Sequence, residues 1–417
     1  MKPKYLLLII SLLFVSSIGY WIIYRDNDGD ASDLQQEPTS IENPNVDSWI
    51  NNRLQFNPVQ VESHDYDSTY TGENISVTGD LASTRFVDCT LKLCGFNDIV
   101  IERCQFINSN IHIVECQNIT FSENLVTQYY VHEDPAILVQ NVDDLNFTLN
   151  TVFNNSIGIA ISGGTSIDIG YNVFEACDQH NAIMGLNSDA RIHNNVFRFN
   201  FPHALMIMNR EEDPWVCLEI FDNLFDRNIE DAINFEDFRG AQEPTLVYNN
   251  VINGTGQAGI NVEYNSWEAN IIVKDNYIFE NGLLTQQILD ELGRPKSVYP
   301  NHEHQPEPYC EGWKHGVKLE DCSGVTLEGN IIVNNRGSGV ECTNARDIHL
   351  RNNTITGNMN GIALRNYYEA SLSREFSPLS QSNAGSSTVY VTDNKVSDNQ
   401  NEDIVVEESC ELIEVSD

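Results

Sequence analysis

The chain contains 417 residues, of which 61 are acidic and 23 are basic, so its formal net charge at pH 7 is −38. A surface with this charge repels nucleic acid and anionic membrane surfaces at a distance, and it excludes nucleic acid as a partner. It also repels a polyuronate unless a cation or a local basic patch intervenes. Adaptation to a saline habitat is an alternative origin of the same acidity. At 41% hydrophobic residues, the chain is long enough to form a sizeable core.

The N-terminal segment has the pattern of an export signal. Lys2 and Lys4 precede residues 5–24, which carry no charge, and Arg25 follows directly. Such a segment spans a bilayer, and its basic end stays in the cytoplasm. No Ala-x-Ala-like cleavage site is evident, which favours a retained signal anchor over a cleaved signal peptide. We therefore expect an extracytoplasmic protein (periplasmic, cell-surface or secreted) that is held at the inner or plasma membrane by residues 1–24.

Residues 25–60 are polar and contain Pro38, Pro44 and Pro58, which is typical of a linker. Residues 61–417 form one further unit in which short motifs recur. Two segments interrupt the recurrence, at 283–314 and 366–388, and we expect both to be insertions.

An Asn with an apolar residue two positions after it, and in most cases another directly after it, recurs at intervals of 22 to 28 residues outside the interruptions. Each step is preceded by a short alternating strand such as Asp347-Ile-His-Leu. Each is followed by another such as Gly259-Ile-Asn-Val. Such spacing predicts stacked coils that bury a common core, and no stretch beyond residue 60 has a sustained helical period. The steps begin at Asn124, Asn150, Asn172, Asn195, Asn223, Asn250, Asn276, Asn330, Asn353 and Asn394.

Over residues 74–408 the repeats resemble the right-handed parallel β-helix family, the pectate-lyase-like coils. The resemblance implies an all-β solenoid of roughly 10–12 coils, with the N-terminal anchor or signal segment outside it. Equivalent Asn side chains would then stack as an internal ladder, and Cys104 takes the ladder position one coil before Asn124. The fold leaves function open, because many activities share such scaffolds.

Aligning the coils places polar side chains in outward-facing columns. The first column contains Asn234, Asn261, Lys318 and Glu341, and the second contains Glu236, Glu263, Glu320 and Thr343. Before these strands the aligned residues are His203, Asp231, Ala258, His315 and Ser338. Neighbouring coils lie about 4.8 Å apart, so three carboxylates would stand in a row and share a proton or a cation. Oxygen ligands favour Ca²⁺, and the predicted set is Glu236, Asn261 and Glu263.

Long connections on either side of these strands predict a groove above the columns. Aromatic residues on its walls, including Trp267 and Trp313, are suited to stacking on sugar rings. We expect Asn234, His203 and Asp231 to bind substrate on the floor of this groove.

Two chemistries fit the same residues. The columns resemble those of the chondroitinase-B and alginate-lyase branch, which implies a calcium-assisted lyase with Lys318 or His315 as the base. Arg365 is its candidate Arg partner, although Asn261-Val-Glu263 departs from the Glu-x-Glu of that branch. Alternatively, a glycoside hydrolase would use a carboxyl pair from Glu263, Glu320 and their neighbours. The resemblance favours the lyase.

A non-catalytic alternative uses the same groove. The protein would then be a glycan-binding module, an adhesin or a periplasmic accessory protein. In either case the expected partner is a polysaccharide or other glycan, and the expected state is a monomer.

The ten cysteines fall mainly in two groups. Disulfides in an exported chain are expected within Cys89, Cys94, Cys104 and Cys116, and within Cys310, Cys322 and Cys342. Cys342 also fits a core position.

Overall fold

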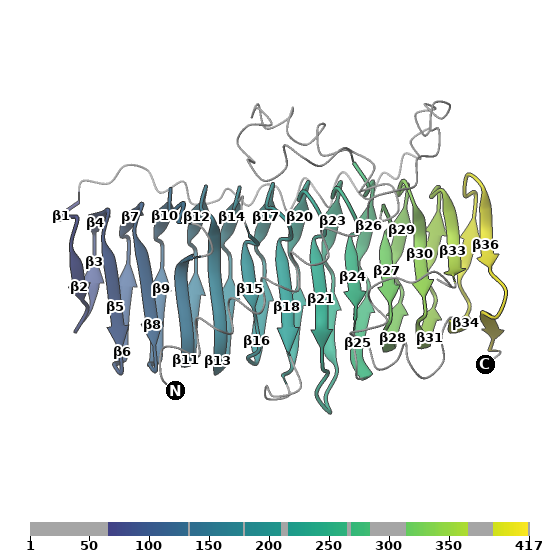
Figure 1. Cartoon of the computed structure of the whole chain (residues 1–417), viewed down its shortest axis with the longest axis horizontal. Helices are drawn as coiled ribbons and strands as arrows, with labels where there is room; N and C mark the ends of the chain where they lie inside the picture. Colours follow the sequence, from purple (N-terminus) through teal and green to yellow (C-terminus); the bar gives the residue numbers. More distant parts are fainter. Residues whose placement is uncertain are drawn as a thin grey trace.

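The structure is a computed structural model that describes residues 66–131, 134–177, 180–209, 216–264, 268–283, 314–365 and 387–415. Every helix or strand assigned in these ranges is a β-strand. Three strand positions make one coil, and the coils stack in chain order along one axis (Figure 1). Strands of neighbouring coils pair in parallel, as β1 with β4 and β21 with β24. The predicted parallel β-helix is confirmed.

The three positions of each coil build three sheets. The first sheet contains β1 (Ser68–Thr71), β4 (Thr84–Val87), β7 (Gln105–Ile107), β10 (Leu125–Thr127), β12 (Thr151–Phe153), β14 (Val173–Glu175), β17 (Val196–Arg198), β20 (Leu224–Asp226), β23 (Val251–Asn253), β26 (Tyr277–Phe279), β29 (Ile331–Val333), β32 (Thr354–Thr356) and β35 (Lys395–Ser397).

The second sheet contains β2 (Asn74–Ser76), β5 (Thr90–Cys94), β8 (Asn110–Val114), β15 (Ile183–Gly185), β18 (Leu205–Asn209), β21 (Ile233–Phe238), β24 (Ile260–Glu263), β27 (Val317–Glu320), β30 (Ser338–Thr343), β33 (Asn360–Arg365) and β36 (Glu402–Val406).

The third sheet contains β3 (Leu81–Ala82), β6 (Asn97–Glu102), β9 (Gln117–Ser122), β16 (Ala190–His193), β19 (Leu218–Phe221), β22 (Thr245–Tyr248), β25 (Glu268–Lys274), β28 (Ser323–Glu328), β31 (Arg346–Arg351), β34 (Thr388–Thr392) and β37 (Glu411–Glu414). Two long strands, β11 (Pro135–Thr148) and β13 (Ile157–Gly170), run through both the second and the third sheet.

The stack is slightly longer than the repeats predict. Its described strands run from Ser68 to Glu414, and the first sheet has 13 strands, one more than the upper bound of 12 coils. The two coils before Cys104 carry no Asn at the repeat position, where Ser68 and Thr84 stand instead. The second insertion ends before Thr388, which already lies in β34. The predicted anchor and linker, residues 1–24 and 25–60, lie outside the described residues.

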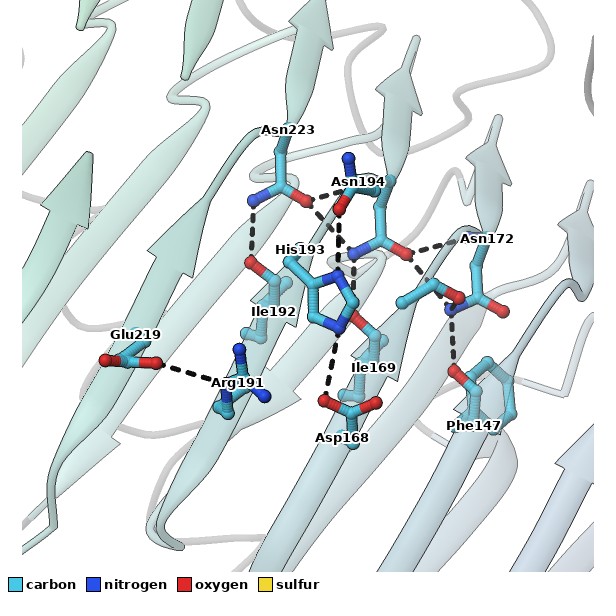
Figure 2. Close-up of polar contacts among 12 residues, drawn as sticks. Phe147, Asp168, Ile169, Asn172, Arg191, Ile192, His193, Asn194, Glu219 and Asn223 are labelled. Atoms are coloured by element: carbon cyan, nitrogen blue, oxygen red, sulfur yellow. Dashed lines mark hydrogen bonds and ion pairs between the residues drawn. The ribbon is translucent and has the colours of Figure 1, made fainter. Parts of the chain in front are cut away.

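The predicted Asn ladder is present at the corner where each coil enters the first sheet. The side chain of Asn223 donates from Nδ2 to the carbonyl of Ile192 (2.8 Å) and to Oδ1 of Asn250 (3.0 Å). Its own Oδ1 accepts from the backbone and side-chain nitrogens of Asn195, both at 3.0 Å. Figure 2 shows this arrangement for Asn172 and Asn223. Cys104 takes the same place at the N-terminal side, where its N–H donates to Oδ1 of Asn124 (2.9 Å).

A second ladder, which the sequence analysis missed, lies at the opposite end of the strands of the first sheet, where each strand finishes. Its members follow those of the first ladder by five residues, as Asn228 follows Asn223. In one example, Nδ2 of Asn200 donates to Oδ1 of Asn228 (2.9 Å) and to the carbonyl of Phe174 (3.2 Å). The ladder is formed by Asn155, Asn200, Asn228, Thr255, Asn281, Asn335, Asn358 and Asn399, with Ser109 before them.

Both ladders depend on a left-handed residue directly before each member. Asp222 has a φ of 56° before Asn223, and Arg227 has a φ of 52° before Asn228. This conformation turns the chain sharply enough to place the next side chain inside the coil. The two corners therefore set the short three-residue strands of the first sheet.

The core is one continuous cluster along the stack, and aromatic rings fill its N-terminal half. Phe174, Phe197 and Phe225 stack from successive strands of the first sheet, with ring centroids 5.0 and 4.9 Å apart. Where that sheet has Val126 and Val152, two rings of the third sheet continue the stack instead. Such compensation keeps the core volume constant between coils.

The nine cysteines in the described residues are all free thiols. The expected disulfides are therefore not formed there; Cys104, Cys322 and Cys342 are instead fully buried in the core. Cys310 lies outside the described residues. In the described part of the chain, no helix has the length and apolar character needed to cross a membrane.

Candidate functional site

The strand register of the second sheet confirms both predicted columns. Asn234, Asn261, Lys318 and Glu341 are direct partners on β21, β24, β27 and β30. Glu236, Glu263, Glu320 and Thr343 are partners two residues further along, and Arg365 follows Thr343 on β33. Apolar residues flank the first column, with Met206 before Asn234 and Ala363 after Glu341.

These outward-facing side chains are buried, which the predicted open groove does not anticipate. Asn234, Asn261 and Glu263 are 1%, 1% and 7% exposed, and Lys318 is 4% exposed. The inward neighbours, such as Val262, belong to the core, so polar and apolar burial alternate along one strand. The floor of the site is therefore shielded from bulk water, which strengthens interactions between its charges.

Two carboxyl groups of this cluster are each held by an Asn amide. Nδ2 of Asn261 donates to Oδ2 of Asp231 (3.2 Å), and Oδ1 of Asp231 accepts from the backbone N–H of Ala258 (2.8 Å). In parallel, Nδ2 of Asn234 donates to Oε1 of Glu263 (3.1 Å). Asp231 comes from the turn before β21 and Glu263 from the end of β24, so the fold joins residues of two successive coils.

Burial makes both groups retain protons. Burial and, to a smaller extent, the neighbouring charge of Glu263 together raise the pKa of Asp231 to about 7, against the opposing effects of the Ala258 N–H, Lys318 and Asn261. Burial also raises the pKa of Glu263, which the positive charge of Lys318 opposes and the charge of Glu320 reinforces. The charge of Glu263 acts on Asp231, so ionisation of Glu263 disfavours ionisation of Asp231.

Lys318 supplies positive charge inside the cluster. Its ammonium group forms an ion pair with Glu320 on the same strand, and its charge acts on Asp231 and Glu263. The ion pair with Glu320 stabilises the protonated form of the amine.

A second polar group lies one coil further along. Nδ1 of His315 accepts from the backbone N–H of Ser338 (3.0 Å), so Nε2 carries the hydrogen that faces Oε1 of Glu341 (3.4 Å). The other oxygen of Glu341 accepts from Ser338 Oγ (3.1 Å) and Arg365 Nε (3.3 Å). Arg365 also pairs with Glu407 (3.0 Å). These contacts hold Arg365 and His315 on Glu341, apart from the Asp231 and Glu263 pair.

His203 repeats the turn geometry of His315. Its Nδ1 lies 3.4 Å from both the backbone nitrogen and Oδ2 of Asp231, and its Nε2 lies 3.4 Å from Nδ2 of Asn234. Burial lowers the pKa of His203 to about 3, with a smaller effect from His180. The imidazole is therefore neutral at the cluster.

Glu230 is a member of the cluster that the sequence analysis missed. Burial raises its pKa to about 8, with smaller contributions from the charges of Asp231 and Glu263. Its side chain keeps some contact with solvent, which offsets part of this shift. The only signal in the sequence is its position directly before Asp231.

The remaining predicted residues are placed less completely. Trp267 and Trp313 lie outside the described residues. Glu236 is at the irregular end of β21, in register with Glu263. Within the described ranges, no group of three or more His, Cys, Asp or Glu side chains is arranged to hold a metal ion. The Asn-containing calcium set stays a prediction.

Comparison with known proteins gives the fold. Residues 218–375 match the family model described as a right handed β-helix region. A double mutant of the periplasmic alginate epimerase AlgG is similar over 85% of this chain and 78% of that chain, at 12% identity and a TM-score of 0.47.

Two further solved structures are similar. The AlgE4 A-module, a mannuronan C-5 epimerase module from Azotobacter vinelandii, covers 82% of this chain and 89% of its own at 13% identity and a TM-score of 0.41. The catalytic unit of an α-1,3-glucanase from Streptomyces thermodiastaticus covers 80% and 64%, at 13% identity and a TM-score of 0.41. No curated protein sequence matches the chain. At these identities the likeness concerns the fold.

Proposed function

We propose that this right-handed parallel β-helix protein is an extracytoplasmic, polysaccharide-active enzyme in which Asp231 and Glu263 transfer the protons of glycosidic-bond cleavage. The observation that carries the proposal is the pair itself, two coupled carboxyl groups on the outer face of a sheet and yet shielded from water. A carboxylic acid that keeps its proton near neutral pH, beside a second carboxyl group, is the equipment of glycoside hydrolysis. The extracytoplasmic location rests on residues 1–24 alone.

The layout of the site supports a polymeric substrate. Its polar side chains come from β21, β24, β27 and β30, and each coil adds about 4.8 Å along the stack. A ligand lying along the columns therefore contacts several coils, as an extended glycan chain does.

β-Elimination is the second candidate, because Lys318 lies within the cluster. A lyase needs a base that is free of its proton, whereas the ion pair with Glu320 favours the protonated amine. Hydrolysis is therefore preferred. Calcium on Glu236, Asn261 and Glu263 is not required by this chemistry, since Lys318 already provides positive charge beside Glu263. No step is assigned to it.

The test is a glycan screen with the full-length protein. Reducing ends and the ultraviolet absorbance of unsaturated products are followed with calcium and with chelator. We expect new reducing ends without that absorbance, unaffected by chelation. Asp231→Asn and Glu263→Gln should each lower turnover on the order of 10²-fold or more, because each removes a proton-transfer group. The matched control is Glu219→Gln on β19 of the third sheet, outside the cluster.

The pH profile gives a second readout. If Asp231 is the general acid, the rate should fall as pH rises through about 7, because the acid then loses its proton. Calcium-dependent absorbance would instead establish the lyase. Glycan binding without either product would establish a non-catalytic binding module.

A further inference from the structure

Two amide oxygens in the cluster have no partner. Oδ1 of Asn234 and Oδ1 of Asn261 are buried and make no hydrogen bond within the described residues. The two side chains are register partners on β21 and β24, each 1% exposed. In both cases the amide nitrogen is engaged with a carboxyl group, so the oxygen is the end left over.

Reversing the amides does not remove the problem. Reversal would leave the same end of each side chain without a partner, now as an NH2 group, and it would require a proton on Oε1 of Glu263 for Asn234 and on Oδ2 of Asp231 for Asn261. A buried acceptor without a donor is destabilising. The missing donors must therefore come from outside the described residues. Thr343, a register partner of Glu320, adds a third buried oxygen of this kind.

The charges around these oxygens discriminate between sugar classes. Glu263 contacts the amide of Asn234 and Asp231 contacts the amide of Asn261, while the charge of Lys318, which is paired with Glu320, acts on both carboxyl groups. A uronate carboxylate would face the two amide oxygens, which cannot donate to it, and the negative charge of the ionised carboxyl groups nearby. In a site shielded from water this repulsion is strong. An ammonium group of an amino sugar would meet Lys318. A neutral hydroxyl group satisfies the acceptors without either repulsion.

We propose that the site takes a neutral, hydroxyl-bearing glycan, whose hydroxyl groups donate to Oδ1 of Asn234 and Oδ1 of Asn261, and that it rejects uronate glycans. This inference rests on the proposed polysaccharide-active function and specifies its substrate class. It makes the two Asn residues substrate-binding residues through their oxygens, while their nitrogens position the proton-transfer pair.

The experiment compares ligands of equal length and different charge. Calorimetric titration of the full-length protein uses neutral hexasaccharides of glucose, mannose and galactose, and hexasaccharides of galacturonate and mannuronate, at low and moderate ionic strength. We expect binding of at least one neutral hexasaccharide and at least about tenfold weaker binding of the uronates. The difference should shrink as salt is added. Equal or tighter binding of a uronate overturns the inference.

Variants then locate the contact. Asn234→Leu and Asn261→Leu should each weaken the neutral hexasaccharide about fivefold to tenfold, the size of a lost buried hydrogen bond. Asn146→Ala, an exposed Asn on β11, is the matched control and should leave binding unchanged. Melting temperatures confirm that each variant is folded. Unchanged binding in both folded Leu variants would mean that water, and not the glycan, donates to the two amide oxygens, and the inference would fail.

The proposed function fails separately from the inference. Neutral glycan binding without turnover supports the inference and contradicts the enzyme. Turnover of a uronate supports the enzyme and contradicts the inference.

Discussion

Asp231 shows at the scale of one residue how a β-helix perturbs an acid. Its carboxyl group is buried beside Glu263, so the protonated form is favoured in the folded state. An unfolded Asp ionises near pH 4, whereas Asp231 ionises near 7. Between these values the folded state binds more protons than the unfolded one, and stability therefore decreases as pH rises. Above this pH range, burial of the ionised Asp231 carboxylate lowers the free energy of unfolding.

Replacing Asp231 by Asn should accordingly stabilise the protein at pH 8 while abolishing turnover. The new amide can accept from the Ala258 N–H as before, and Asn261 can turn its unpartnered oxygen toward the new nitrogen. We expect a gain on the order of 1–3 kcal/mol at pH 8 that disappears near pH 4. Thermal unfolding across this range measures it. A variant less stable than the wild type at pH 8 would show that Asp231 is not held protonated.

At the scale of the element, each strand of the first sheet depends on a ladder residue at its beginning and another at its end. A ladder side chain satisfies backbone groups of the preceding coil, as Asn223 does for the carbonyl of Ile192 and the N–H of Asn195. The ladders and the left-handed residues before them act together, because the turn delivers the amide to the inside. The corners on both sides therefore fix the position of each strand, although most strands of the first sheet are only three residues long.

Removing one ladder amide should lower the free energy of unfolding more than removing the amide of an exposed Asn does. In Asn223→Ala the carbonyl of Ile192, the backbone and side-chain nitrogens of Asn195 and the side-chain oxygen of Asn250 lose partners. We expect a loss of about 3–5 kcal/mol of unfolding free energy in urea. Asn146→Ala should change it by less than about 0.5 kcal/mol. Similar losses in the two variants would contradict the ladder's role.

At the scale of the whole molecule, the charge of −38 works against the fold. Mutual repulsion of like charges destabilises a compact state and is screened by salt. The polar cluster on the second sheet contributes to it through those of its carboxyl groups that are ionised, of which Glu320 pairs with Lys318 and Glu341 with Arg365.

Sodium chloride should therefore raise the melting temperature by several degrees between dilute buffer and physiological ionic strength, where the screening length falls to about 8 Å. Potassium chloride at equal concentration should act equally, because screening does not distinguish the two cations. If calcium raises the melting temperature by more than this screening effect, it binds a specific site, and the predicted set of Glu236, Asn261 and Glu263 would be supported. A melting temperature independent of salt would mean that the surface charges are already compensated.

The sequence by itself determined the solenoid, the first ladder and the two outward columns, because all three follow from a repeat of nearly constant length. Asn261 falls opposite Asn234 once the coils are aligned, whatever the loops between them do. The second ladder had a signal too, an Asn five residues after the first, although it was overlooked.

Only the tertiary structure decided that these columns are buried, that Lys318 turns to Glu320, and that Arg365 and His315 join Glu341 instead. Arg365 and His315 reach Glu341 through contacts between coils, whereas Lys318 and Glu320 lie two residues apart on one strand and pair through the orientation of their side chains. Burial, which raises the pKa of Asp231, is a property of everything packed above the strand, and a periodic pattern carries no information about that cover.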